Sequence, residues 1–127
     1  MLRNVLVLIV GAALFGVAGA AFSVVHASIR RGLPRNRSLG IKTRATLASD
    51  EAWRAGHDAA RPWLRSSALT AYTASVVCGA VALISQSPSE GVVALVMVSG
   101  FAALITVLIC AGVIADRAAR SASTPSP

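Results

Sequence analysis

The stretch VLVLIVGAALFGVAGAAFSVV, residues 5–25, contains no charged side chain and decides the class of this protein. An α-helix needs roughly 20 apolar residues to cross the hydrocarbon core of a bilayer, and this run is long enough. Two further uncharged runs follow at residues 68–85 and 92–115. The chain of 127 residues is 55% hydrophobic and 13% charged, whereas a soluble domain is roughly 25% charged. We therefore expect an all-α integral membrane protein with three transmembrane helices.

A short polar segment, residues 85–91, separates the second run from the third and includes Ser85, Pro88 and Gly91. A connection this short joins antiparallel neighbours, so we expect these two spans to form a hairpin. Residues 1–120 are expected to make one membrane module. Residues 121–127 are rich in Ser and Pro and are expected to be a disordered tail.

The basic residues predict the orientation in the membrane. Short loops that carry Lys and Arg stay on the cytoplasmic side. The chain has a net charge of +7, and most of its basic residues lie in the segment 26–67: Arg30, Arg31, Arg35, Arg37, Lys42, Arg44, Arg54, Arg61 and Arg65. We expect an outside N-terminus, with the loop 26–67 and the C-terminus on the cytoplasmic side of a bacterial inner membrane.

The first run also has an alternative interpretation. Ala18-Gly19-Ala20 resembles the cleavage site of a secretory signal peptide. Cleavage there would leave the basic loop outside, against the charge rule, and a retained first helix is therefore favoured.

A helix is expected to begin inside the loop at Ser49, because a Ser oxygen caps free backbone N–H groups and Asp50 and Glu51 complement the positive helix end. From there one face is apolar and the opposite face is charged and mostly basic: Trp53, Gly56, Ala60 and Leu64 against Arg54, Asp58, Arg61 and Arg65. Pro62 is expected to end this short amphipathic helix and to open the next one. The amphipathic helix is then expected to lie along the membrane surface, where it contacts anionic lipids. Nucleic acid is not expected as a partner, because Trp53 and Trp63 are too few for a base-stacking platform.

The residue types that catalysis and metal binding need are scarce. Cys78 and Cys110 would differ in depth by roughly 18 Å in an antiparallel hairpin, which excludes a disulfide. His57 has no second His or Cys nearby, so a hydrogen-bonding role within the loop is favoured over metal binding or proton transfer. No charged residue lies within a span to form an ion pathway. We expect no enzymatic activity, no metal and no cofactor.

Small residues recur at a spacing of four in two spans, as Ala12, Gly16 and Ala20 and as Ala71, Ser75 and Gly79. Such residues let helices approach closely in lipid, so the first and second spans are candidates for packing along these stripes. The alternative is that an Ala-rich chain produces the spacing by chance.

The loop also carries a motif, Pro34-x-Asn36-x3-Gly40-Ile41-Lys42-Thr43-x2-Thr46-x2-Ser49-x3-Trp53-x3-His57, which resembles the signature of the SdpI family in a short, three-helix form. Gly40 is expected to adopt a backbone conformation closed to other residues. The residues that the resemblance makes candidates for the motif or for partner binding are Asn36, Gly40, Ile41, Lys42, Thr43, Thr46, Ser49, Trp53 and His57.

The resemblance implies a non-enzymatic bacterial membrane protein that gives immunity to a peptide toxin, or that signals by capturing a partner at its cytoplasmic loop. Lys42 stands where relatives usually have Arg, which keeps the charge but loses the planar fork that grips carboxylate or phosphate. The namesake of the family is longer, so immunity need not extend to this form. The alternative is a small accessory or assembly subunit in a homo- or hetero-oligomeric membrane complex.

Overall fold

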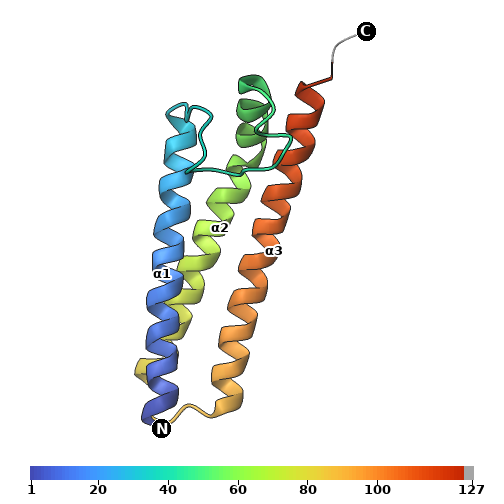
Figure 1. Ribbon diagram of the computed structural model, residues 1–127. Coiled ribbons are helices and arrows are strands. Elements are labelled where there is room, and N and C mark those ends of the chain that lie inside the picture. The colour runs from blue at the N-terminus through green and yellow to red at the C-terminus, as the bar shows by residue number, and fades with distance from the viewer. Residues whose placement is uncertain (125–127) are drawn as a thin grey trace.

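The computed structural model describes residues 1–124 and contains three long helices that run side by side (Figure 1). They are α1 (Leu2–Arg30), α2 (Asp50–Ile84) and α3 (Glu90–Ala122). Each has the length and composition needed to cross a membrane, and each exceeds the roughly 30 Å hydrocarbon thickness at 1.5 Å per residue. No strand occurs in the described range. The expected all-α fold with three spans is confirmed.

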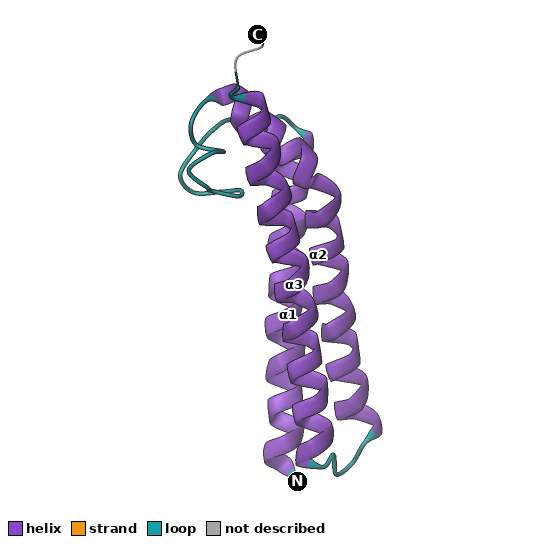
Figure 2. Ribbon diagram, turned by 90° about the vertical axis from the view of Figure 1, so that its right-hand side faces the viewer, coloured by secondary structure: helices purple, strands orange, loops and turns teal. Residues whose placement is uncertain are grey.

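Helix α2 packs extensively against both α1 and α3, whereas α1 and α3 contact each other much less. Residues 31–49 and the C-terminal end of α3 lie at one end of the bundle, which we call the loop end (Figures 1 and 2). Met1 and the turn 85–89 lie at the opposite end, the hairpin end. The predicted α2–α3 hairpin is confirmed, and the basic loop lies at the same end of the molecule as Arg117 and Arg120 of α3.

The core between the helices is narrow, and its fully buried members include Leu8, Phe15, Ala71 and Cys78. Most large apolar side chains instead face outward, as Val17 does with 70% of its surface exposed. An outward apolar surface of this kind is stable in lipid, because acyl chains solvate it as well as a protein core does.

The stripes of small residues pack together in part: Ala71 is fully buried, and Ala12 packs against the same core cluster. The Ser75 hydroxyl donates a 2.6 Å hydrogen bond to the Ala12 carbonyl, and a Cβ on Gly16 would lie 3.4 Å from Ser75 Oγ. Ala20 is exposed, and a Cβ on Gly79 would meet nothing within 4 Å. Three buried positions of α1, Gly11, Phe15 and Gly19, each precede a position of the predicted stripe by one residue, whereas buried Leu8 is in register with it.

The prediction of a separate short helix ending at Pro62 is wrong, because α2 continues through Pro62 from Asp50 to Ile84. An interior proline costs a helix about 3 kcal/mol. Pro62 is exposed, while Ala60 and Leu64 are buried on the other face. Continuing the helix keeps that apolar face packed, and this packing outweighs the local preference of proline to end a helix. The basic part of α2 therefore prolongs the bundle rather than turning aside from its axis.

Helix α3 also extends further than its span, to Ala122, and so takes in the first two residues of the segment expected to be a disordered tail. The Ser123 hydroxyl donates to the Ala119 carbonyl, and the Thr124 hydroxyl donates to the Arg120 carbonyl. Residues 125–127 of the predicted tail lie outside the described residues.

Candidate functional site

The loop-end part of α2 begins as its sequence predicts. The Ser49 side chain accepts a 3.0 Å hydrogen bond from the Ala52 N–H, and Asp50 and Glu51 occupy the first turn. Asp50 also forms an ion pair with Arg35 at 3.0 Å, which ties the loop to the start of α2. The predicted helix cap is confirmed.

Trp53 and His57 lie one turn apart on α2 and are almost fully buried, at 1% and 2% exposure. Their ring centroids are 4.0 Å apart. The Trp53 indole N–H donates a 2.9 Å hydrogen bond to the Leu33 carbonyl. This bond holds the beginning of the loop against α2.

His57 holds the middle of the loop through its ring nitrogens. The backbone N–H of Ile41 lies 2.9 Å from His57 Nε2, so Nε2 accepts and carries no proton. The ring proton is therefore on Nδ1, which donates to the Trp53 carbonyl at 2.8 Å. Burial lowers the pKa of His57 below its ordinary value, although the Trp53 carbonyl and the charge of Asp58 act in the opposite direction. The hydrogen-bonding role predicted for His57 is confirmed.

Gly40 lets the loop approach this pair of rings. Its φ is +100°, and a Cβ at this position would lie 2.5 Å from His57 Nε2 and 3.2 Å from Trp53 Cη2. A side chain would be strained by the backbone angle and would also collide with the imidazole. The prediction for Gly40 is confirmed.

Thr43 and Thr46 close the second half of the loop. The Thr43 N–H donates to Thr46 Oγ1 at 2.9 Å, and the Thr46 N–H donates to Thr43 Oγ1 at 3.2 Å. The buried Thr46 hydroxyl donates in turn to the Ile41 carbonyl at 2.9 Å. On α3, the Arg120 side chain donates a 2.7 Å hydrogen bond to the Asp116 carboxyl, and hydrogen bonding lowers the pKa of that carboxyl.

Asn36 and Lys42 organise the entry to the loop. Asn36 Oδ1 accepts hydrogen bonds from the N–H groups of Ser38 and Leu39 at 2.8 and 2.7 Å. The Lys42 ammonium donates to the carbonyls of Arg37 and Ser38 at 3.1 and 3.0 Å. The cation at position 42 therefore binds backbone oxygens of its own loop rather than a carboxylate.

The motif residues thus come together in one hydrogen-bonded network that folds the loop over the loop end of α2. Most of their polar groups bond within the loop or to α2, and the basic side chains exposed on the loop include Arg37, Lys42 and Arg44. Within residues 1–124 no group of three His, Cys, Asp or Glu side chains is arranged to hold a metal ion. The folded loop is therefore suited to presenting its exposed basic side chains as a binding surface.

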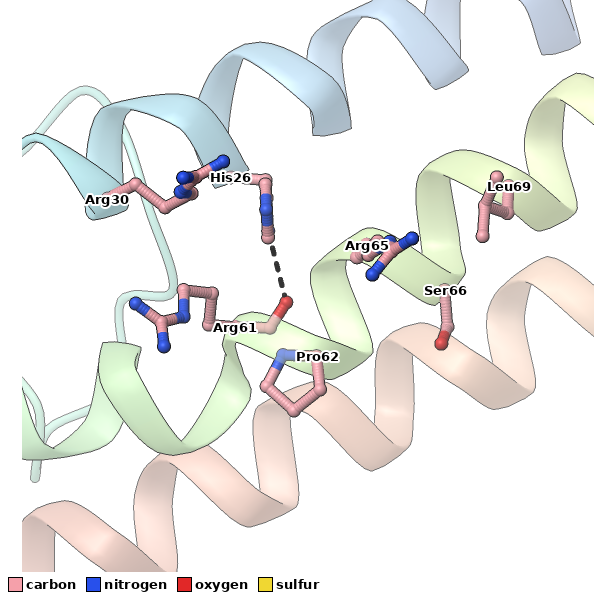
Figure 3. Close-up of a pocket in the computed structure, with 7 residues that line it drawn as sticks. All are labelled: His26, Arg30, Arg61, Pro62, Arg65, Ser66 and Leu69. Atoms are coloured by element: carbon pink, nitrogen blue, oxygen red, sulfur yellow. Dashed lines mark hydrogen bonds between the residues drawn. The ribbon is translucent and has the colours of Figure 1, made fainter.

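A second feature was not predicted: an open groove of about 1030 Å³ between α1 and α2 at the loop end. His26 and Arg30 of α1 face Arg61 and Arg65 of α2 across it, as Figure 3 shows. The His26 Nδ1 lies 3.2 Å from the Arg61 carbonyl and donates to it, which links the two walls. Residues 26 and 61 are far apart in the sequence, so no local pattern signals their contact.

A model of the SdpI/YfhL protein family matches residues 32–114, a range that includes every motif residue, the whole of α2 and most of α3. Comparison with curated proteins and with solved structures returned no match.

Proposed function

Because the chain belongs to the SdpI/YfhL family and is a multi-pass membrane protein, we propose that it is a non-enzymatic bacterial inner-membrane protein whose ordered loop binds a protein partner at the cytoplasmic face. This binding serves signalling by partner capture, or immunity to a peptide toxin that acts on the membrane.

The observation that carries the proposal is the ordered loop itself. Residues 31–49 contain no helix or strand, yet the buried His57 and Trp53 side chains of α2 form hydrogen bonds with their backbone. Loops longer than about 12–15 residues without secondary structure are uncommon unless they are functional or disordered. Ordering each residue costs about 1–2 kcal/mol of conformational entropy. A loop that only connects two helices does not require this ordering.

The exposed charge of this loop supports a partner with an acidic surface. Arg37, Lys42 and Arg44 are exposed on the same loop, and complementary charge accelerates association and selects among partners. The test is a photo-crosslinking residue introduced in living cells at position 37 or 44, with position 87 at the hairpin end as control. One defined adduct from the loop and none from position 87 is the expected result. No adduct from either loop position would count against partner binding.

Immunity is tested separately, by expressing the chain in cells that are sensitive to a membrane-active peptide. Survival should rise with the amount of protein in the membrane. A lack of protection at every expression level would exclude immunity but would leave partner binding intact.

The proposed orientation rests on the basic residues gathered at the loop end and is tested with Ser38→Cys and Ser87→Cys, both at exposed positions. A membrane-impermeant thiol reagent should label position 87 in intact cells and position 38 only after lysis. The reverse pattern would overturn the orientation.

The second candidate function, an accessory or assembly subunit, is supported by a groove between α2 and α3. It has a volume of about 360 Å³, and its lining includes the small or hydroxylated residues Thr70, Thr73, Ser99 and Gly100. Residues of these types favour helix association in lipid. Purification in a mild detergent should then return a stoichiometric partner, whereas a clean monomer or homo-oligomer would count against this candidate.

A further inference from the structure

The groove between α1 and α2 concentrates positive charge that the protein does not neutralise. Arg30, Arg61 and Arg65 line it together with His26, and no acidic residue does. Across residues 1–124 the ion pairs involve Arg3, Arg35 and Arg120, and none of the three groove arginines donates a side-chain hydrogen bond. Like charges placed together raise the free energy of the fold, and a bound anion would remove this cost.

The groove lies at the depth where a membrane changes from polar to apolar. The uncharged run of α1 ends at Val25, directly before His26, and that of α2 begins at Ala68, three residues after Arg65. Leu69 closes the apolar side of the groove and is 57% exposed. The basic side chains therefore lie at headgroup level, while Leu69 lies at the start of the acyl-chain region.

The chemistry of the lining fits a phosphate group. Guanidinium groups bind phosphate oxygens through two parallel N–H donors, and Ser66 adds a hydroxyl donor to the same groove. Basic pockets between transmembrane helices on the cytoplasmic side bind anionic headgroups. The bond from His26 to the Arg61 carbonyl links the two walls of the groove.

We propose that this groove binds the phosphate headgroup of one anionic phospholipid, with an acyl chain lying against Leu69. The lipid bridges α1 and α2 at the loop end, and this binding does not depend on a protein partner or a toxin. It is distinct from general attraction of a basic surface to the membrane, because it requires arginines from two helices at one place.

The test is native mass spectrometry of the full chain in detergent, titrated with phosphatidylglycerol or with phosphatidylcholine. The wild type should retain one phosphatidylglycerol in preference to phosphatidylcholine. Arg30→Gln combined with Arg65→Gln should weaken phosphatidylglycerol binding by about tenfold or more, since each basic residue contributes to attraction at the surface. The control, Arg54→Gln with Arg117→Gln, removes the same charge from exposed positions outside the groove and should change binding by less than about twofold.

Equal weakening of phosphatidylglycerol binding in the two double variants would overturn the site, and so would the absence of a preference between the two lipids. Glycerol phosphate that binds as tightly as the whole lipid would also overturn it, because this result would indicate a site for free phosphate. Thermal unfolding establishes whether the groove variant is folded. If it is not, Arg30→Lys with Arg65→Lys keeps the charge and loses the paired donors, and it should bind phosphatidylglycerol more weakly than the wild type does. Unchanged binding in that variant would also contradict the proposal.

Discussion

The imidazole of His57 accepts a 2.9 Å hydrogen bond at Nε2 from the backbone N–H of Ile41, which lies 16 residues earlier in the chain. The bond requires a neutral ring, because a protonated imidazole has no free lone pair. The order of the loop is therefore coupled to the charge of one buried side chain.

Acidification is expected to loosen the loop. Burial lowers the pKa of His57 in the folded protein, so the folded chain binds fewer protons than the unfolded chain. The stabilisation is complete above the ordinary pKa of about 6.5 and is lost as the pH falls below it toward the lowered pKa. In a Trp63→Phe background, Trp53 fluorescence should shift to the red as the pH falls below about 6.

Two histidine variants serve as controls for this pH response. His57→Gln should remove the response, whereas His26→Gln, which alters the groove instead, should keep it. An acid transition of unchanged size in His57→Gln would contradict the coupling.

Gly40→Ala is expected to destabilise the loop by about 1–3 kcal/mol, because the new Cβ would be strained at a φ of +100° and would lie 2.5 Å from His57 Nε2. Hydrogen exchange of residues 33–49 should rise accordingly. Gly32→Ala is the matched control: its φ is +82°, but a Cβ there would meet nothing within 4 Å. Gly32→Ala should destabilise the loop only through backbone strain, by about 1 kcal/mol. Equal exchange in the two variants would contradict the contact between Gly40 and His57.

Gly56→Ala is expected to separate α2 from α3 at the loop end. Its Cβ would lie 2.8 Å from the Ala115 carbonyl oxygen and 2.9 Å from Thr46 Cγ2. The free energy of unfolding should fall by about 1–3 kcal/mol in a detergent titration. Gly79→Ala, which meets nothing within 4 Å, should be neutral or stabilising by up to about 1 kcal/mol. A stable Gly56→Ala protein with unchanged loop exchange would argue against this close approach.

Ser75→Ala removes the 2.6 Å hydrogen bond to the Ala12 carbonyl, which joins α1 to α2 inside the predicted span. Such bonds contribute about 0.6 kcal/mol on average in membrane proteins, so a loss of about 0.5–1.5 kcal/mol is expected. Ser99→Ala is the control, because its hydroxyl is exposed and bonds only within α3, to the Val96 carbonyl. The same detergent titration measures the free energy of unfolding of both variants. A larger loss in Ser99→Ala than in Ser75→Ala would contradict the prediction.

Pro62 and His26 show where prediction from sequence reaches its limit. Local patterns place Pro62 at a helix boundary, yet buried Ala60 and Leu64 keep α2 continuous, because packing against neighbouring helices outweighs one lost hydrogen bond. His26 follows the first apolar run without any motif. Its position opposite Arg61 depends on how α1 and α2 are aligned, which no short segment encodes.

The sequence by itself determined the three spans and the hairpin, because these depend on hydropathy. It also determined the cap at Ser49 and the need for glycine at position 40, which depend on local backbone geometry. The family to which the chain belongs follows from a motif that lies within one segment. Only the tertiary structure decided that the motif residues hold the loop against α2, that α2 continues through Pro62, and that arginines of two helices meet in one groove. The physical reason is that these contacts join residues far apart in the chain, and their free energy arises from burial and charge that exist only after the helices have packed.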